Sequence, residues 1–233
     1  MVNYSTIYVL KHTMQMNQEL FDKLLKLVPN ERRYFLIKQN FKKAQIHLLG
    51  DALVRYILCT KYNLNNSELI FNHSKYGKPL LKTMEDFHFN ISHSKNWIVL
   101  AVDNFPIGID IEILRDVNFK IAKRFYTNQE YNYILRTSGH DKTKRFYEVW
   151  TMKESYMKAI GKGFLLSPTS FDTLDFNGTT KIDGREYYFS KFFLRKLVLC
   201  TLCSTKKKVK IEYINDKILI LNILNILEKE GKF

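Results

Sequence analysis

Two carboxylates alternate with isoleucines in the segment Gly108-Ile-Asp-Ile-Glu-Ile113. Because side chains alternate across a β-strand, Asp110 and Glu112 would share one face of such a strand, and the isoleucines would occupy the other. Residues two apart along a strand are separated by roughly 6–7 Å, so both carboxylates can reach one cation. The segment therefore indicates a metal site, although a half-exposed strand with its acidic face in water would show the same pattern.

A second set of functional side chains recurs every four residues. Trp150, Glu154 and Lys158 would lie along one side of an α-helix. Glu154 could supply a third oxygen ligand, and Mg²⁺ binds oxygen ligands while keeping positions for phosphate and water. In isolation, Glu154 and Lys158 would be an ordinary surface ion pair, which stabilises a helix by only about 0.3–0.5 kcal/mol.

Two further polar segments carry weak signals on their own. His93 lies in Asn90-Ile-Ser-His-Ser94, in a polar connection of hairpin length between apolar segments. Lys78 lies in Tyr76-Gly-Lys-Pro79, a loop whose proline constrains the backbone. A single histidine at a turn is more often a surface residue than a ligand, so these residues gain meaning only in combination with the carboxylates.

The segments that must position these residues combine helices and strands. Apolar spacing predicts helices from Asn17 to about Val28, over a longer stretch ending near Tyr62, and over 128–135 and 142–160. Strands are predicted at 6–10, 87–91, 98–102, 107–114, 171–175, 186–190 and 197–203. Helices and strands that interleave with mostly short connections are typical of an α+β fold.

Composition narrows the class of protein further. The chain has 233 residues, of which 45% are hydrophobic and only 9 are glycine and 4 proline, which predicts a packed protein of one large or two small domains. A net charge of +14 favours anionic partners: nucleic acid, a membrane surface, a phosphorylated cofactor or an acidic protein. Three cysteines, no signal-peptide pattern and no apolar stretch of membrane-spanning length lead us to expect a cytoplasmic protein.

The cysteine pair Cys200-Thr-Leu-Cys203 has the spacing of a redox or zinc half-site. It lies in an apolar segment that predicts a buried strand, and no second Cys/His pair is available to complete a zinc tetrahedron. We therefore interpret both residues as core cysteines.

In their order and spacing, the motifs together resemble those of the Sfp-type 4′-phosphopantetheinyl transferases. The resemblance runs from about Ser5 to about Cys203, and its most specific part is the acidic segment paired with Trp-x-x-Lys-Glu-x-x-x-Lys. The matching segments are Leu48-Leu-Gly-Asp-Ala-Leu-Val-Arg55, Tyr76-Gly-Lys-Pro79, His88-Phe-Asn-Ile-Ser-His-Ser94, Ile107-Gly-Ile-Asp-Ile-Glu112, Trp150-Thr-Met-Lys-Glu-Ser155 with Lys158, and Gly161-Lys-Gly163.

This resemblance implies an enzyme that moves phosphopantetheine from coenzyme A to a serine of an acidic acyl or peptidyl carrier protein and releases 3′,5′-ADP. It also implies two similar α+β halves in one chain, residues 1–105 and residues 106–233, with the metal site in the second half. A monomer is expected, with neither nucleic acid nor membrane as a partner. The alternatives are a metal-dependent nuclease, which would use the same carboxylates, and a basic nucleic-acid-binding module.

The resemblance also assigns roles at the reacting phosphates. Asp110, Glu112 and Glu154 would bind Mg²⁺ together with the coenzyme A pyrophosphate, and Lys158 would contact the same pyrophosphate. Glu130 occupies the position proposed as the base that deprotonates the carrier serine. Such a phosphoryl transfer depends mainly on positioning and on charge neutralisation.

The remaining implied contacts bind the nucleotide and its phosphates. Ser92 and His93 match residues that touch the coenzyme A phosphates, His93 adding positive charge or a donor during transfer, and Lys78 matches a loop lysine at the nucleotide. Where relatives hold the 3′-phosphate with two lysines and a threonine, this chain departs from the pattern. The aligned residues are Glu31, Tyr34 and His47, and the basic residues close by are Arg32, Arg33, Lys42 and Lys43.

Overall fold

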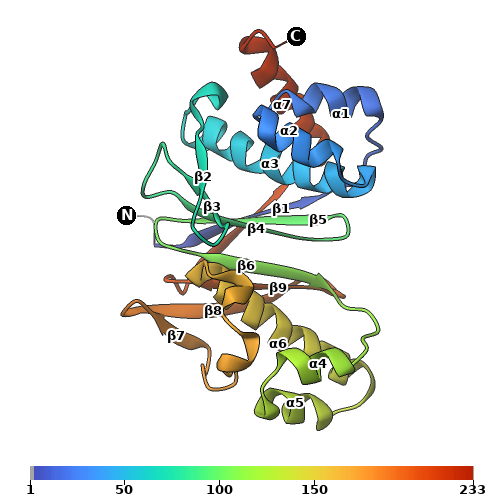
Figure 1. The fold of residues 1–233 in the computed structure, drawn as a ribbon, viewed down its shortest axis with the longest axis vertical. Helices are drawn as coiled ribbons and strands as arrows, with labels where there is room; N and C mark the ends of the chain where they lie inside the picture. Colours follow the sequence, from blue (N-terminus) through green and yellow to red (C-terminus); the bar gives the residue numbers. More distant parts are fainter. Residues whose placement is uncertain (1–2, 233) are drawn as a thin grey trace.

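The computed structural model describes residues 3–232, apart from the side chain of Phe164. The chain forms two four-stranded sheets that stack with helices on the outside (Figure 1), and β2 and β3 pair separately as a small two-stranded sheet. The elements are β1 (Ser5–Lys11), α1 (Gln18–Leu25), α2 (Asn30–Ile37), α3 (Phe41–Lys61), β2 (Phe71–His73), β3 (Pro79–Leu81), β4 (His88–Ser94), β5 (Trp97–Asp103), β6 (Gly108–Ile113), α4 (Lys120–Phe125), α5 (Asn128–Leu135), α6 (Gly139–Ile160), β7 (Thr179–Ile182), β8 (Arg185–Arg195), β9 (Val198–Ser204), β10 (Val209–Ile214) and α7 (Asp216–Lys229).

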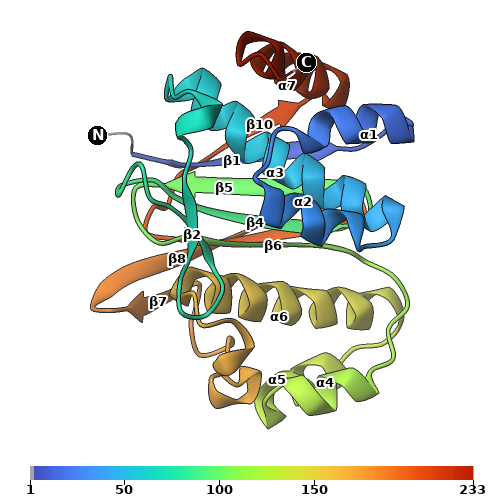
Figure 2. The same ribbon diagram turned by 45° about the horizontal axis from the view of Figure 1, so that its top comes forward.

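The first sheet has the strand order β10-β1-β5-β4, and α1, α2, α3 and α7 cover its outer face (Figure 2). Both faces of its central strands are buried, because the helices cover the outer face and the second sheet covers the inner face. In β1, Tyr8 and Leu10 pack under the helices, while Ile7 and Val9 point to the opposite side. This explains why the central strands are apolar at successive positions instead of alternating between apolar and polar residues.

The second sheet has the order β6-β9-β8-β7 with antiparallel pairing throughout, and α6 packs on its outer face. Gly108 allows β6 to approach α6 closely, because a Cβ atom at this position would lie 1.9 Å from the carbonyl oxygen of Ser155. The helix that carries Glu154 and Lys158 is therefore held directly against the strand that carries Asp110 and Glu112.

The inner faces of the two sheets share one apolar core. Val99 of β5, Ile109 and Ile111 of β6, and Cys200 of β9 are members of this cluster, each at most 1% exposed. The molecule is thus a helix–sheet–sheet–helix stack, and the predicted α+β class is confirmed. The cysteine pair is buried in β9, so the interpretation as core residues holds.

The end of the described chain returns to the first half. Strand β10 pairs in parallel with β1, with Ser5 opposite Val209 and Leu10 opposite Ile214. Helix α7 then packs against α3 and buries Leu219 and Ile223 completely in the first core. The expectation that residues 106–233 form the second half is therefore wrong from about residue 209 onward.

Other predicted elements differ in detail. The predicted strand at 171–175 is wrong: Thr173 N donates to Glu130 and Leu174 N to Asp172, so these backbone groups bond to side chains in a turn instead of a sheet. The helix predicted to reach Val28 ends at Leu25, and α2 follows after Pro29. The helix at Asn128–Leu135 is confirmed with the same bounds. No helix in the described part of the chain is long and apolar enough to span a membrane.

Candidate active site

The two halves meet where β4 and β6 run beside each other without forming a common ladder. Instead, β4 side chains accept the backbone N–H groups of β6 at every second residue. Asn90 Oδ1 accepts from Ile109 N at 2.8 Å, and Ser92 Oγ accepts from Ile111 N at 3.4 Å. Ser94 Oγ accepts from the next alternate amide of β6 at 3.3 Å. This β4–β6 seam fixes the two halves in one register.

The same serines hold the two strand carboxylates. Ser92 Oγ donates to Asp110 Oδ1 and Ser94 Oγ to Glu112 Oε2, each at 2.9 Å. The predicted alternation is correct, since Asp110 and Glu112 face α6 and the serines while the intervening isoleucines enter the core between the sheets. Asp110 is 4% exposed, so its carboxylate lies in the protein interior rather than on a wet strand face.

Lys158 completes the group from the helix side. Its Nζ lies 2.7 Å from Asp110 Oδ1 and also donates to Ser92 Oγ at 3.1 Å and to the carbonyl oxygen of Ile109 at 3.2 Å. The ordinary surface pair between Glu154 and Lys158 does not form within the described residues. Lys158 instead neutralises the buried aspartate within the second half, and its bond to Ser92 reaches across to the first half.

Burial and neighbouring carboxylates raise the proton affinity of Glu112 and Glu154. Burial raises the pKa of Glu154 to about 7, the charges of Asp110 and Glu112 add to this rise, and Lys158 opposes it. Burial and the neighbouring Asp110 likewise raise the pKa of Glu112, against the hydrogen bond from Ser94. Lys158 is thus the one lysine bonded within a group of three carboxylates. A bound cation would bring the charge of this group closer to neutral.

A magnesium ion fits this site in donor chemistry. Asp110 Oδ2 and Glu154 Oε1 are buried oxygens without a hydrogen-bond partner in the described structure. Unpaired buried carboxylate oxygens are costly, and oxygen ligands are those that Mg²⁺ prefers. Among the described residues, no three His, Cys, Asp or Glu side chains are already arranged as a metal-binding group. Mg²⁺ commonly takes only one or two carboxylates and completes its shell with phosphate and water.

His93 lies at the outer end of β4, next to His47 of α3. The centroids of the two imidazole rings are 4.9 Å apart. Desolvation lowers the pKa of both histidines, that of His47 to about 4, and Lys43 contributes to the lowering in each case. Both rings are therefore neutral at pH 7 and can donate or accept one hydrogen bond per nitrogen.

Lys78 lies elsewhere than its expected role requires. Its Nζ donates to the carbonyl oxygens of Lys158 at 2.7 Å, Ile107 at 2.9 Å and Ala159 at 3.4 Å. Burial lowers its pKa to about 8. In this structure Lys78 binds the C-terminal end of α6, where free carbonyl groups and the helix dipole favour a cation.

The two arginines expected near the 3′-phosphate also have internal partners. Arg32 forms a bidentate ion pair with Asp51, with Nε–Oδ2 at 2.8 Å and Nη2–Oδ1 at 3.2 Å. Arg33 donates to the carbonyl oxygens of Val28 and Lys26 at the end of α1. Both guanidinium groups therefore fasten α2 to its neighbours.

Glu130 is fully buried, with 0% of its surface exposed. Its carboxylate accepts hydrogen bonds from Thr127 N in a capping box and from Thr173 N and Oγ1. Lys153 Nζ lies 2.8 Å away and is 1% exposed. Both of its oxygens are bonded and the side chain is fully buried, which favours a structural role and argues against the expected role as the base.

Sequence reasoning overlooked three residues that build the site. Asn90 and Ser94 form the β4–β6 seam, and Lys153 holds Glu130. A usable signal existed for the seam, since polar residues at 90, 92 and 94 have the same period of two as the acidic strand. Lys153 carried no such signal, because a lysine beside Glu154 on a helix is ordinarily solvent-exposed.

Comparison with known proteins agrees with this arrangement. A family model described as the 4′-phosphopantetheinyl transferase superfamily matches residues 106–203, and one described as the 4′-phosphopantetheinyl transferase N-terminal region matches residues 14–105. The 4′-phosphopantetheinyl transferase Sfp of Bacillus subtilis is 38% identical over 167 residues, covering 71% of this chain and 74% of the relative. The chain belongs to the 4′-phosphopantetheinyl transferase superfamily.

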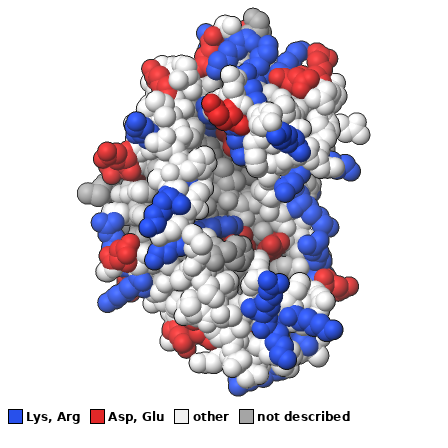
Figure 3. Space-filling view, in the orientation of Figure 1, with Lys and Arg blue, Asp and Glu red and all other residues white. Residues whose placement is uncertain are grey.

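A second relative within this superfamily supports the same conclusion. The 4′-phosphopantetheinyl transferase ffp of Bacillus subtilis is 36% identical over 185 residues, covering 78% of this chain and 82% of the relative. The two matched regions of the superfamily adjoin between Phe105 and Pro106, so the β4–β6 seam and its carboxylates lie where they meet. Figure 3 shows that this face is hollowed near its middle and that Lys and Arg side chains line its right-hand edge.

Proposed function

We propose that this protein is a magnesium-dependent 4′-phosphopantetheinyl transferase that acts on the serine of an acyl or peptidyl carrier protein. The observation that carries the proposal is the group at the β4–β6 seam. Asp110 and Glu112 of β6 face Glu154 and Lys158 of α6, and two carboxylate oxygens in this group are buried and unbonded. Its acidic residues suit a metal and its lysine suits a phosphate.

In this proposal the carrier serine oxygen attacks the β-phosphorus of coenzyme A. The new O–P bond forms as the bond to the bridging oxygen breaks, and 3′,5′-ADP leaves with that oxygen and its charge. Asp110, Glu112 and Glu154 would hold Mg²⁺, which when bound would offset charge on the pyrophosphate. Lys158 and His93 line the same site and would donate to phosphate oxygens.

The serine must also lose its proton. Because Glu130 is enclosed, the proton acceptor has to come from the exposed side of the site. Glu154 lies in the site with one unbonded carboxylate oxygen, and a carboxylate placed beside the serine can accept its proton. We assign the proton transfer to Glu154, either directly or through a water molecule.

Intact-mass analysis of an apo-carrier protein tests the proposal. Incubation with the protein, coenzyme A and Mg²⁺ should increase the carrier mass by one phosphopantetheine, with equimolar release of 3′,5′-ADP. The Asp110→Asn variant keeps the hydrogen bond from Ser92 and should fold, yet it should transfer nothing. A carrier mass that does not change with the wild-type protein, for fatty-acid, polyketide and peptide-synthetase carriers alike, would refute the proposed function.

The proposal extends to partners and assembly. Carrier proteins are typically acidic, which suits a chain of net charge +14. One chain contains both matched regions and the seam between them, so we expect the active form to be a monomer. The nuclease and nucleic-acid-binding alternatives gain no support from the two relatives described above, which are both named as transferases.

A further inference from the structure

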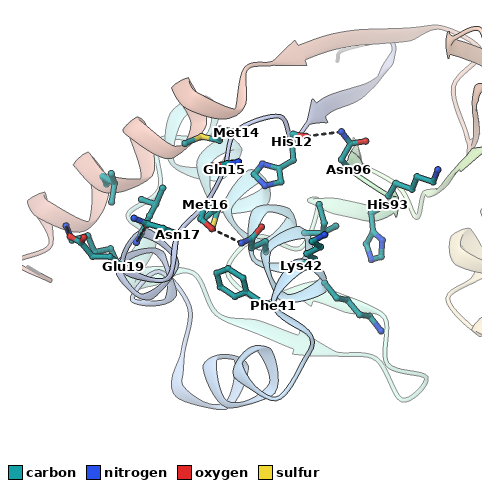
Figure 4. Close-up of a pocket in the computed structure, with 17 residues that line it drawn as sticks. His12, Met14, Gln15, Met16, Asn17, Glu19, Phe41, Lys42, His93 and Asn96 are labelled. Carbon is teal, nitrogen blue, oxygen red and sulfur yellow. Dashed lines mark hydrogen bonds and ion pairs between the residues drawn. The ribbon is translucent and has the colours of Figure 1, made fainter.

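Strand β4 presents its two faces to different halves of the molecule. On one face, Ile91 packs against the first core, and His93 lines a hollow of about 1100 Å³ in the first half (Figure 4). Because side chains alternate along a strand, Asn90, Ser92 and Ser94 point the other way, toward β6. The hydroxyl groups of the two serines therefore belong to the surroundings of the strand carboxylates.

Each of these hydroxyl groups makes two bonds to β6. Ser94 Oγ accepts from a backbone amide of β6 at 3.3 Å and donates its proton to Glu112 Oε2 at 2.9 Å. Ser92 Oγ makes the corresponding bonds, to an amide at 3.4 Å and to Asp110 Oδ1 at 2.9 Å. Since a hydroxyl has only one proton, the bond from the amide directs that proton to the carboxylate. The first half thus holds one oxygen of each strand carboxylate.

The second oxygen of each strand carboxylate is left without a partner. Asp110 Oδ1 is bonded to Ser92 and Lys158, whereas Oδ2 of this 4% exposed side chain is buried and unbonded. Within residues 3–232, no hydrogen bond or ion pair reaches Glu112 Oε1, and none reaches either oxygen of Glu154. The strand therefore presents two single oxygens to the site, and the helix presents a carboxylate with both oxygens free.

Magnesium and calcium differ in how they use such ligands. Mg²⁺ requires a nearly ideal octahedron at about 2.0–2.1 Å, and it usually binds one or two carboxylates together with phosphate and water. Ca²⁺ takes roughly six to eight oxygens at about 2.3–2.6 Å, and it often binds both oxygens of one carboxylate. A carboxylate with one oxygen bonded to a hydroxyl offers a single oxygen, which suits Mg²⁺ and opposes the two-oxygen binding that Ca²⁺ uses.

The backbone that carries these carboxylates has little freedom to adjust to a larger ion. Gly108 packs β6 against the backbone of α6 at Ser155, and on the other face Ile109 and Ile111 are at most 1% exposed in the core between the sheets. A change in carboxylate binding must therefore come from rotation of the side chains. The serine hydroxyls restrain that rotation, and they can be removed without altering the apolar core.

We infer that Ser94 is a positioning residue that makes the metal site selective for Mg²⁺ over Ca²⁺, by holding Glu112 as a single-oxygen ligand. The inference rests on the proposed function, in which Asp110 and Glu112 hold the ion, and it names the residue that discriminates between divalent cations. Ser92 holds Asp110 in the same way. Because the resemblance also places Ser92 at the coenzyme A phosphates, the test uses Ser94.

Displacement of Mn²⁺, followed by electron paramagnetic resonance, tests the inference without coenzyme A or a carrier protein. Mn²⁺ suits oxygen ligands, and adding Mg²⁺ in one titration and Ca²⁺ in another gives the two dissociation constants. The wild-type protein should bind Mg²⁺ more tightly than Ca²⁺. In Ser94→Ala the ratio of the Ca²⁺ constant to the Mg²⁺ constant should fall roughly tenfold, because Glu112 becomes free to bind Ca²⁺ with both oxygens.

Two further variants separate the hydroxyl from other effects of the substitution. Ser94→Thr keeps the hydroxyl and suits a strand, so it should retain the wild-type ratio. Ser138→Ala removes an exposed serine that makes no side-chain capping bond at the start of α6, and it should also change nothing. Ser94→Ala leaves an amide of β6 without its acceptor. A general loosening of the site would weaken both ions alike and leave their ratio unchanged.

The outcomes distinguish the inference from the function on which it rests. An unchanged ratio in folded Ser94→Ala would overturn the inference, and so would a wild-type protein that binds Ca²⁺ as tightly as Mg²⁺. In either case, Mg²⁺-dependent transfer from coenzyme A to an apo-carrier would leave the proposed function standing. A wild-type protein that binds no Mn²⁺ and transfers without a metal would show that both the inference and the magnesium dependence are wrong.

Discussion

Asp110 and Glu154 each hold one buried carboxylate oxygen without a partner. A buried acceptor without a hydrogen bond costs on the order of 1–3 kcal/mol, and a charged one costs more. Natural proteins retain such atoms mainly where function requires them. At the scale of single residues, these atoms therefore destabilise the folded protein in the absence of a cation. The effect should be measurable as a pH dependence of the free energy of unfolding.

The Glu154→Gln variant should remove one part of that dependence. The pKa of Glu154 rises from 4.5 to about 7 on folding, so the folded protein binds the proton more tightly than the unfolded chain. The resulting stabilisation is complete below pH 4.5 and is lost as the pH rises through 7. Urea unfolding should show the metal-free wild type losing stability over this range relative to Glu154→Gln, and Mg²⁺ should reduce the loss. Parallel stability curves for the two proteins would contradict the prediction.

Glu130 and Lys153 form an ion pair in which both side chains are at most 1% exposed. Glu130→Gln should lower the free energy of unfolding by about 3–5 kcal/mol, because it leaves the lysine charge buried without a counter-charge. The transfer rate per folded molecule should stay near that of the wild type, whereas loss of a catalytic base would reduce it roughly 10²–10⁴-fold. Chemical denaturation and the transfer rate, both measured well below the melting temperature, distinguish the two roles.

A Glu130→Gln/Lys153→Met protein is the control for this variant. Removing both charges should restore part of the lost stability, since an apolar pair of similar volume avoids the unpaired charge. If the double variant is no more stable than Glu130→Gln, the ion pair does not explain the effect.

At the scale of elements, two contacts position the C-terminal part of α6. Gly108 lets β6 lie against the backbone at Ser155, and Lys78 binds three carbonyl oxygens, two in the last turn of α6 and one at Ile107 before β6. The carbonyl of Lys158 is one of these three, so the loop from the first half is bonded to the residue that pairs with Asp110. Lys78 thus acts through Lys158 and is a positioning residue.

Lys78→Met should therefore change the rate more than the binding. Methionine keeps an apolar stem but no donor, so stability should decrease by about 1–3 kcal/mol as carbonyl partners are lost. The kcat of the transferase reaction should fall while KM for coenzyme A stays near the wild-type value. Lys75→Met, from an exposed position in the same loop over the Tyr76 ring, should change neither. A raised KM with unchanged kcat would instead indicate the nucleotide contact that the resemblance implied.

These elements also mark the limit of what could be predicted from the sequence. The alternation at Asp110 and Glu112 and the helical spacing at Glu154 and Lys158 are local patterns, and the structure has both. The partners of Lys78, Arg33 and Glu130 depend on contacts between segments far apart in the chain or on loop conformation. The predicted strand at 171–175 failed for this reason, because the amide of Thr173 bonds to the distant Glu130 and the amide of Leu174 bonds to the side chain of Asp172 in the same turn.

At the scale of the whole molecule, the segment that contains β10 and α7 completes the sheet and the core of the first half. It lies outside the regions matched by the family models, yet it contributes a sheet strand and core residues. Asp216, at the start of α7, accepts hydrogen bonds from Thr13 N at 2.6 Å and Met14 N at 3.0 Å. This contact fastens α7 to the segment that follows β1.

Asp216→Ala should therefore destabilise the first half of the molecule more than the second half. The variant leaves two backbone amides without acceptors and should lower the free energy of unfolding by about 1–3 kcal/mol. Native-state hydrogen exchange should become faster in β1 and β10, while amides of β9 in the second sheet should remain protected. Uniform acceleration across both sheets would show instead that the two halves unfold as one cooperative unit.

The parallel pairing of β1 with β10 has a consequence for protein synthesis. A ribosome makes the chain from its N-terminus, so β1 emerges long before Val209 and its neighbours can pair with it. Until then, one edge of β1 stays open to pairing with other chains. The strands of the second sheet all precede β10, so the half that is made later can complete its sheet earlier. We therefore expect this one strand to reverse the usual order of folding during translation, in which the N-terminal part folds first.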